Sequence, residues 1–264
     1  MNRLSYILLL LLLPLAASAQ DCAVSVADIS AQETGVQYVS YPQKTYFVGC
    51  GSADVLDTYL SPFSYTGTSA YLAREVQYDH TLHNLSVSGC FTENPFGNVH
   101  EYVADIRYGV AHQFTVLNCN GLYVKAGPMA SVLFGGILNG RNGNNPTQIK
   151  ASLTADFSAR IGYALRIGRM TLPIQYTIGV PCVGVAFSPD FGQSYYELTL
   201  GMFDHNIKFS NFVDAPSMCH RLTVGLPIRK HILKVGYMGR VDQSRYNSLR
   251  YHYYTHSLIL GFEL

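Results

Sequence analysis

Polar and apolar residues alternate along several long stretches of this chain, most clearly from Lys150 to Arg160. Over this stretch every second residue is polar or charged, and the residues between them are apolar. A period of two places the polar residues on one face of a β-strand and the apolar residues on the other. The same pattern runs over residues 100–113 and 231–243. Each stretch reaches the roughly 9 to 11 residues that a tilted strand needs to cross a bilayer, whereas strands in general average about five or six.

The last residues of the chain, 250–264, keep this alternation up to the carboxyl terminus. Four apolar residues share one face of the predicted strand: Leu258, Leu260, Phe262 and Leu264. Such a strand suits the closing position of an outer-membrane β-barrel, where it pairs with the first strand and presents apolar side chains to lipid. A C-terminal strand of a soluble β-protein is the alternative on these residues alone.

The amino terminus favours the exported barrel. Residues 1–19 contain a basic residue, then an apolar core, then a run of small residues at 17–19. This order is that of a secretory signal peptide, and the apolar core is too short to span a membrane as a helix. We therefore expect residues 1–19 to be removed, residues 20–43 to form a periplasmic lead and residues 44–264 to form the barrel.

The composition agrees with an exported, apolar β-structure. The chain is 48% hydrophobic and only 13% charged, and it contains 20 Tyr, 13 Phe and no Trp. The Tyr and Phe residues fit the aromatic girdles of a membrane barrel. Removal of the signal peptide takes away one basic residue, Arg3, and leaves 17 basic and 17 acidic residues. This balance argues against nucleic acid as a partner.

Counting strands backward from the carboxyl terminus gives an even number and puts both termini at the periplasmic end, as in bacterial barrels. We predict an all-β fold, a transmembrane antiparallel up-and-down β-barrel of 12 strands. The pattern is weakest at 206–213, and omission of this strand with one neighbour gives the alternative of 10 strands. The predicted strands are 44–51, 67–78, 81–92, 99–116, 121–137, 149–166, 170–186, 192–202, 206–213, 217–227, 230–242 and 250–264.

Five short segments, most of them in predicted loops, can be compared with known families. They are Val55-Leu-Asp-Thr-Tyr-Leu-Ser-Pro62, Ser64-Tyr-Thr-Gly67, Thr92-Glu-Asn-Pro95, Arg141-Asn-Gly-Asn-Asn-Pro146 and Phe187-Ser-Pro-Asp-Phe-Gly-Gln-Ser-Tyr-Tyr-Glu197. Together they resemble an outer-membrane β-barrel family of Bacteroidetes that is catalogued as a domain of unknown function. The resemblance runs from about Gly49 to the end, and 187–197 is its most specific part. It implies the location and the architecture, and no activity.

Small outer-membrane barrels include lipid hydrolases, of the phospholipase or lipid A deacylase type, so such an enzyme is the alternative function. It requires a Ser nucleophile and a His base within hydrogen-bond reach. His256 and Ser257 are adjacent and face opposite sides of a strand, and Ser194 lacks the second Gly of a nucleophile elbow. His252 or His256 with a Ser on a neighbouring strand stays open, because this pairing depends on register. We assign no catalytic residues and interpret both His as girdle residues.

Metal sites and disulfides can be judged from spacing. His80 and His83 lie on opposite faces of a strand, and the six Cys show no short paired spacing. We therefore predict no metal and no cofactor. Cys22 and Cys119 are both predicted at the periplasmic end, which makes them the one pair that we consider for a disulfide in an oxidising compartment.

The inward faces of the predicted strands carry the candidate functional residues. Equal numbers of acidic and basic side chains favour ion pairs that fill a narrow barrel, because an ion-selective pore usually carries one sign. Tyr195, Tyr251 and Tyr253 are predicted to narrow the bore further. The charged residues predicted to face the lumen are Glu101, Asp105, Arg107, Lys150, Asp156, Arg160, Glu197, Arg221, Lys234, Arg240, Asp242 and Glu263.

These patterns predict a monomeric β-barrel of the bacterial cell outer membrane with a narrow or plugged interior. Its expected function is passive: restricted, porin-like passage of a small solute, or a structural and surface-interaction role through loops 52–66 and 139–146. The expected partners are outer-membrane lipid and, through the C-terminal strand, the barrel-assembly machinery.

Overall fold

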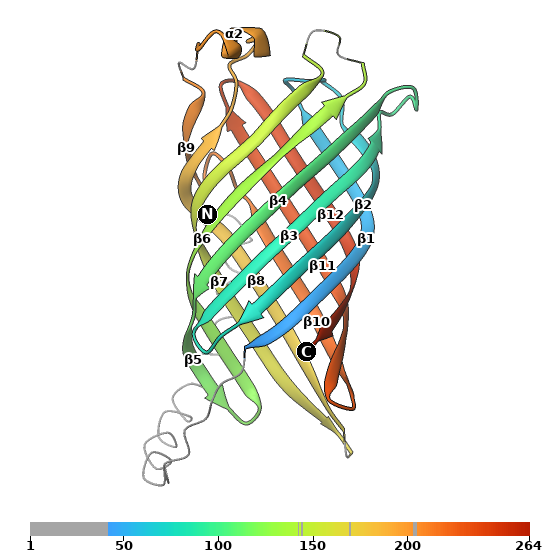
Figure 1. Ribbon diagram of the computed structural model, residues 1–264, viewed down its shortest axis with the longest axis vertical. Helices are drawn as coiled ribbons and strands as arrows, with labels where there is room; N and C mark the ends of the chain where they lie inside the picture. Colours follow the sequence, from blue (N-terminus) through green and yellow to red (C-terminus); the bar gives the residue numbers. More distant parts are fainter. Residues whose placement is uncertain (1–41, 142, 144, 169, 203–204) are drawn as a thin grey trace, which may run out of the picture.

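The structure, a computed structural model, describes residues 42–264 apart from 142, 144, 169, 203 and 204. The chain forms one antiparallel sheet that closes on itself as a barrel, with a short helix, α2 (Tyr195–Thr199), at its upper end (Figure 1). The strands are β1 Gln43–Asp57, β2 Tyr65–Gln77, β3 Thr81–Glu93, β4 His100–His112, β5 Phe114–Cys119, β6 Leu122–Asn139, β7 Thr147–Ile167, β8 Met170–Phe187, β9 Ile207–Asn211, β10 Met218–Ile228, β11 His231–Tyr246 and β12 Leu249–Glu263.

Ten of these strands make the ring, and β5 and β9 lie outside it. β5 pairs with the lower part of β6, and β9 pairs with the upper part of β8. The ring runs through β1, β2, β3, β4, β6, β7, β8, β10, β11 and β12, and β12 pairs with β1 to close it. The predicted count of 12 is therefore wrong, and the alternative of 10 is right for the ring.

Two predicted ring strands, 192–202 and 206–213, belong to the connection between β8 and β10 and do not enter the ring. Residues 192–202 include α2 instead of a strand, because Ser194 and Glu197 cap its first turn. Ser194 Oγ accepts the Glu197 amide at 3.3 Å, and Glu197 Oε2 accepts the Ser194 amide at 2.7 Å. The predicted strand 206–213 is β9, whose five residues are too few to cross a bilayer.

Other boundaries move by smaller amounts. The predicted strand 99–116 is interrupted at Gln113, whose backbone amide donates to His80 O at 2.7 Å, so that β5 leaves the ring. β1 continues to Asp57 and β2 begins at Tyr65, which shortens the predicted loop 52–66. The signal peptide and most of the predicted periplasmic lead lie outside the described residues.

The register of β1 against β12 fixes the two ends of the barrel. Thr45 pairs with Glu263 near the lower end, and Asp57 pairs with Tyr251 near the upper end. The first and last strands are thus neighbours over their whole length, and the carboxyl terminus lies at the end opposite α2 (Figure 1).

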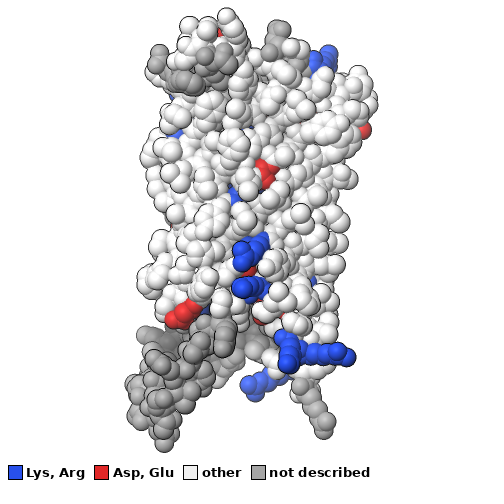
Figure 2. Space-filling model, viewed as in Figure 1, with Lys and Arg blue, Asp and Glu red and all other residues white. Residues whose placement is uncertain are grey.

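The wall is apolar outside and polar inside. Val48, Leu72, Leu153 and Leu258 are each more than half exposed on the outer face, whereas ten of the charged residues on the ring strands are buried. Figure 2 shows a face that is white over most of its area, with Lys and Arg visible chiefly in its lower half. Among the described residues, no helix is long and apolar enough to cross a membrane.

Small apolar clusters pack between the polar side chains of the interior. One contains Phe47, Tyr71, Met238 and Ile259. The Phe47 ring lies where a side chain on Gly261 would project, since a Cβ there would meet a ring carbon at 2.5 Å. Glycine at this position therefore lets the ring cover the inner surface of β12.

Candidate functional site: the bore and its cap

Eleven of the twelve charged residues predicted for the lumen lie on ring strands and project into the bore. Glu197 does not, because it belongs to α2 above the barrel, and Tyr195 lies there too. Two further acids of the bore, Asp57 and Glu75, are not in the predicted set. All six basic side chains of the predicted set have an ion-pair partner in the bore.

The middle of the bore is crossed by ion pairs between β4 and β11. These strands lie five places apart in the ten-strand ring, so they face each other across the interior. Arg240 binds Asp105 at 2.8 Å and Asp242 at 2.5 Å, and Arg107 binds Asp242 at 3.0 Å. Arg240 also donates to Ser88 Oγ at 2.8 Å. The two walls are therefore joined through a network that leaves both arginines paired.

A second crossing lies below the first. Glu75 on β2 binds Arg160 on β7 at 2.6 Å and also binds Arg221 on β10. Each of these strands is four places from β2 in the ring, so one carboxylate ties three parts of the wall. The Arg221 guanidinium lies 4.1 Å from the centre of the Phe47 ring, which provides a cation–π contact.

A third crossing lies near the upper end, and a shorter pair lies at the base. Lys150 on β7 binds Asp57 on β1 at 2.8 Å, again between strands five places apart, and its ammonium lies 3.8 Å from the centre of the Tyr251 ring. At the base, Lys234 binds Glu263 at 2.6 Å on the neighbouring strand. The bore is thus crossed at three levels along its length.

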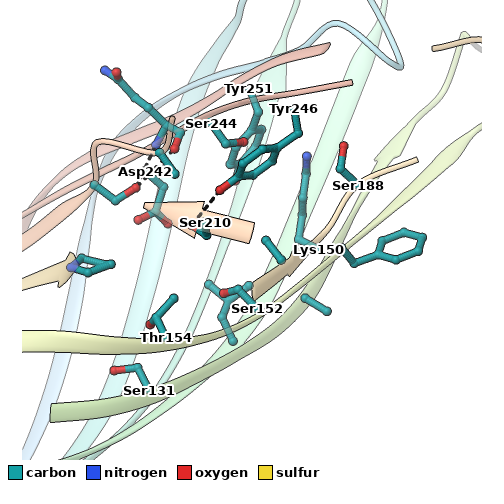
Figure 3. A pocket seen from close by; sticks show the side chains of 18 of the residues that line it. Ser131, Lys150, Ser152, Thr154, Ser188, Ser210, Asp242, Ser244, Tyr246 and Tyr251 are labelled. Atoms are coloured by element: carbon teal, nitrogen blue, oxygen red, sulfur yellow. Dashed lines mark hydrogen bonds between the residues drawn. The ribbon is translucent and has the colours of Figure 1, made fainter. Parts of the chain in front are cut away.

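Two cavities remain between these crossings. The upper cavity, of about 110 Å³, has both apolar side chains and hydroxyl groups in its lining, the latter including Ser152, Thr154 and Ser210, and Tyr246 donates to Ser210 at 2.7 Å (Figure 3). The lower cavity, of about 100 Å³, adjoins it, because Asp156 and Arg107 line both. Spaces of this size hold several water molecules or one very small solute.

The upper end is covered by the connection between β8 and β9. Its described part, residues 188–202, 205 and 206, is called the cap here. Gln193 is its centre: its carbonyl accepts the Tyr59 hydroxyl at 2.6 Å, and its side-chain oxygen accepts the Asn206 amide at 2.6 Å. Asn247, in the β11–β12 turn, donates to Pro189 O at 3.1 Å. The β1–β2 and β11–β12 loops therefore hold the cap, and the contact with Asn206 braces it from within.

Two tyrosines at the underside of the cap have raised pKa values. Burial, followed by the nearby Tyr195 and Asp57, raises the pKa of Tyr59 to about 12. Burial is also the largest cause of the raised pKa of Tyr195, whose hydroxyl accepts the Ile149 amide at 2.6 Å. Both hydroxyls are therefore neutral hydrogen-bonding groups at physiological pH.

The outer side of the cap exposes apolar side chains. Phe191 is 76% exposed and Tyr196 is 71% exposed, and Leu200 and Met202 are more than half exposed. These side chains stand on a segment whose backbone is fixed by the hydrogen bonds to Gln193. Exposed aromatic residues on a fixed backbone are typical of binding surfaces.

A polar cluster occupies the outer wall near the upper rim. His252 Nε2 lies 3.1 Å from Asp54 Oδ1 and 3.4 Å from Ser64 Oγ, and Ser64 Oγ also donates to Asp54. The register thus brings a Ser beside His252. His256 instead contacts the Tyr237 hydroxyl, through Nδ1 at 2.5 Å.

The cysteines divide into one bonded and four free among the described residues. Cys119 is disulfide-bonded, and Cys50, Cys90, Cys182 and Cys219 are free. The predicted partner of Cys119, Cys22, lies outside the described residues. In the described part of the chain, no group of three or more His, Cys, Asp or Glu residues could hold a metal ion.

A family model matches residues 5–263, nearly the whole chain, and its description is "Protein of unknown function (DUF3316)". The chain belongs to this family. The predicted resemblance to a family of unknown function is confirmed at that level. No curated protein matches the chain.

Several solved structures are similar to this member of DUF3316 at low sequence identity. The outer membrane protease OmpT from Escherichia coli has a TM-score of 0.49 at 7% identity, over 87% of this chain and 98% of that one. Neisserial surface protein A has a TM-score of 0.37 at 8% identity, over 84% and 96%. The transport unit of the autotransporter AIDA-I from Escherichia coli has a TM-score of 0.37 at 9% identity, over 94% and 97%.

Proposed function

We propose that this DUF3316 protein is an outer-membrane β-barrel whose bore is closed by ion pairs and whose working surface is the cap. The observation that carries this proposal is the set of crossings at Arg240, Glu75 and Lys150, which join opposite parts of the wall. A barrel that passes solutes freely keeps a water-filled lumen. The role that fits a closed bore is structural and surface interaction.

The energetics support a bore that stays closed. Separation of one buried ion pair costs about 3–5 kcal/mol when a charge is left without a partner. A state in which one such pair parts while its charges stay buried is then populated at roughly 1% or less, since each 1.4 kcal/mol is a factor of ten. Free passage requires the crossings at all three levels to part.

The orientation of the barrel supports a role for the cap outside the cell. Both termini of a bacterial barrel lie in the periplasm, and the cap lies at the opposite end of this ring. The exposed Phe191 and Tyr196 then face the surroundings of the cell on a backbone held by Gln193. A fixed backbone lowers the entropy lost on binding.

Solute passage and partner binding can be tested separately. For passage, liposomes that contain the purified protein are mixed with an isotonic sugar solution, and swelling is followed by light scattering; we expect the rate of protein-free liposomes. Swelling at the rate of a general porin would contradict the closed bore.

For binding, Phe191→Ala with Tyr196→Ala is expected to reduce attachment of intact cells to a host-cell or glycan surface, with Phe63→Ala outside the cap as the control. If cells with the wild-type protein, with the double variant and with the control variant attached equally well, a role for the cap would be contradicted.

Lipid hydrolysis is a second candidate, favoured by the contact between Ser64 and His252. In a Ser–His–acid triad the serine and the acid bind different imidazole nitrogens. Here both Ser64 and Asp54 meet Nε2, so the observed arrangement ties β1, β12 and the start of β2. The enzyme hypothesis predicts covalent labelling of Ser64 by a fluorophosphonate and phospholipid turnover that Ser64→Ala removes. If neither labelling of Ser64 nor phospholipid turnover is found, the cluster has only the structural role of linking β1, β12 and the start of β2.

The remaining expectations concern processing, assembly and oligomeric state. Removal of residues 1–19, recognition of the C-terminal strand by the barrel-assembly machinery and a monomeric state are still predictions. N-terminal sequencing of the membrane-inserted protein and light scattering in detergent test the first and the last of them.

A further inference from the structure

The outer wall has a groove at the seam where the barrel closes. It crosses β11, β12, β1, β2 and β3, which are consecutive neighbours in the ring, and its volume is about 530 Å³. The groove lies outside the bore, because its walls are formed by apolar side chains exposed on the outer face. Six of them are Val48, Leu72, Leu85, Val87, Leu260 and Phe262.

One charged residue, Arg74 on β2, lines this groove. Arg74 is exposed, whereas the next residue, Glu75, is buried in the bore. The residues paired with Arg74 are Tyr46 on β1 and Leu85 on β3, and neither carries a negative charge at neutral pH. No acid of the described residues forms an ion pair with Arg74. An arginine thus stands on an apolar wall without a counter-ion from the described part of the chain.

The level of Arg74 on the wall is near the end of the barrel that carries the carboxyl terminus. β2 runs toward that end and finishes at Gln77, three residues beyond Arg74. A tilted strand rises about 2.5 Å per residue along the barrel axis, so Arg74 lies about 8 Å above the end of its strand. The headgroup layer of each leaflet is about 5–8 Å thick, and a long arginine side chain extends to it from the hydrocarbon boundary. This level fits the headgroups of the periplasmic leaflet.

A second basic residue, Lys44, adds positive charge at the same end of the groove. It precedes Tyr46 by two residues on β1, so both belong to the outer face, and it is half-buried. Its partner on β2 is Val76, which makes Arg74 its diagonal neighbour, at about 7–8 Å. Lys44 has no ion-pair partner among the described residues either. Two positive charges therefore stand at the lower end of an apolar groove.

We propose that this groove binds one glycerophospholipid of the periplasmic leaflet, with its phosphate at Arg74 and Lys44 and an acyl chain along Val48 and Leu72. A guanidinium binds phosphate through charge-assisted hydrogen bonds, and the apolar walls suit a hydrocarbon chain. A lipid without an anionic group would leave both positive charges without a counter-ion. The proposal rests on the outer-membrane location proposed above, and it is independent of the closed bore and of the cap.

The test is a titration of the purified full-length mature protein in detergent, followed by native mass spectrometry. Phosphatidylethanolamine is compared with diacylglycerol of the same acyl chains, and one phospholipid is expected to bind in a saturable manner. Diacylglycerol, which lacks the phosphate, should bind about tenfold or more weakly, since hydrogen bonds to a charged group are lost. Inorganic phosphate at the same concentration should not displace the phospholipid, because it has no chain for the groove.

Three variants locate the site on the wall. Arg74→Gln should weaken phosphatidylethanolamine binding about tenfold or more, for the same reason. Arg74→Lys keeps the charge without the guanidinium fork and should lose less. Arg229→Gln is the matched control: it removes an exposed arginine from the β10–β11 turn, outside the groove, and should bind as the wild type does.

Several results would overturn the proposal. They are equal binding of phosphatidylethanolamine and diacylglycerol by the wild type, displacement of the lipid by inorganic phosphate, and unchanged binding in Arg74→Gln. A lipid-free dimer that Leu72→Lys dissociates would show that a second copy of the chain covers the groove instead.

A second measurement uses the wild type alone, in case Arg74→Gln does not fold. Phosphatidylethanolamine with a photoreactive group on its acyl chain should label residues 46–48, 72 or 85–87, and labelling spread evenly around the outer wall would contradict the site. Flotation with lipid vesicles tests the membrane location separately. Protein that floats but binds no phospholipid at the groove refutes this site alone, whereas protein that does not float refutes the proposed function as well.

Discussion

The substitution Glu75→Gln tests how much one carboxylate contributes to the closed bore. Glu75 is buried and binds both Arg160, at 2.6 Å, and Arg221. The glutamine has nearly the same shape but no charge, so two buried guanidinium groups lose their counter-ion. Arg160 keeps one neutral contact, with Gln77 Oε1 at 2.9 Å.

The expected loss follows from the cost of an uncompensated buried charge. Removing one partner of a buried ion pair destabilises a protein by about 3–5 kcal/mol. Because two arginines share Glu75, we expect the free energy of unfolding to fall within or above this range. That corresponds to a ratio of unfolded to folded protein that rises by roughly 100- to 4000-fold or more.

The measurement is urea unfolding in lipid vesicles, followed by far-ultraviolet circular dichroism, since the chain has no Trp to report by fluorescence. The matched control is Glu93→Gln, which removes a half-exposed acid that lies 3.3 Å from His100 at the rim. An exposed pair of this kind contributes about 0–1 kcal/mol. If Glu75→Gln were as stable as Glu93→Gln, the lower crossing would not stabilise the barrel and the reasoning would be refuted.

Three further predictions concern the cap, the inner wall and the disulfide. Gln193→Ala removes the side-chain contacts that hold the cap, so limited proteolysis of the protein in detergent should cleave within 188–206 faster than in the wild type; an unchanged rate contradicts the role of Gln193. Gly261→Val places a side chain against the Phe47 ring and should cost about 1–3 kcal/mol in urea unfolding, whereas a neutral effect means that the ring moves freely. Peptide mapping by mass spectrometry without reductant should find Cys119 linked to Cys22, and a different partner would exclude the predicted pair.

The alternation of polar and apolar residues predicts the ring because burial on one face constrains every second residue. From Lys150 to Arg160 this period is unbroken, and the structure puts that segment on β7 with its polar face inward. The same reasoning fails for the connection between β8 and β10, because the apolar residues of that segment are also compatible with a strand. The informative signal there is local: Ser194 followed three residues later by Glu197 forms the capping box of α2.

The contacts within the bore are less predictable than its lining. Arg74 and Glu75 are adjacent charges, and one of them must face outward, so composition alone does not select Glu75 for the interior. The predicted loop 52–66 contains Asp57, because the polar residues after Gly51 do not indicate that β1 continues to this position. The contact of Ser64 with His252 depends on the register across β12, β1 and β2, which side-chain alternation leaves open.

The conductance of the purified protein in planar lipid bilayers tests the closed bore most directly. The wild type is expected to give no stepwise current at any applied voltage, because the crossings at Arg240, Glu75 and Lys150 close the interior. The double variant Arg107→Ala with Arg240→Ala removes the middle crossing; if it inserts and conducts while the wild type does not, the network is the barrier. Regular single-channel steps from the wild type would contradict the closed bore.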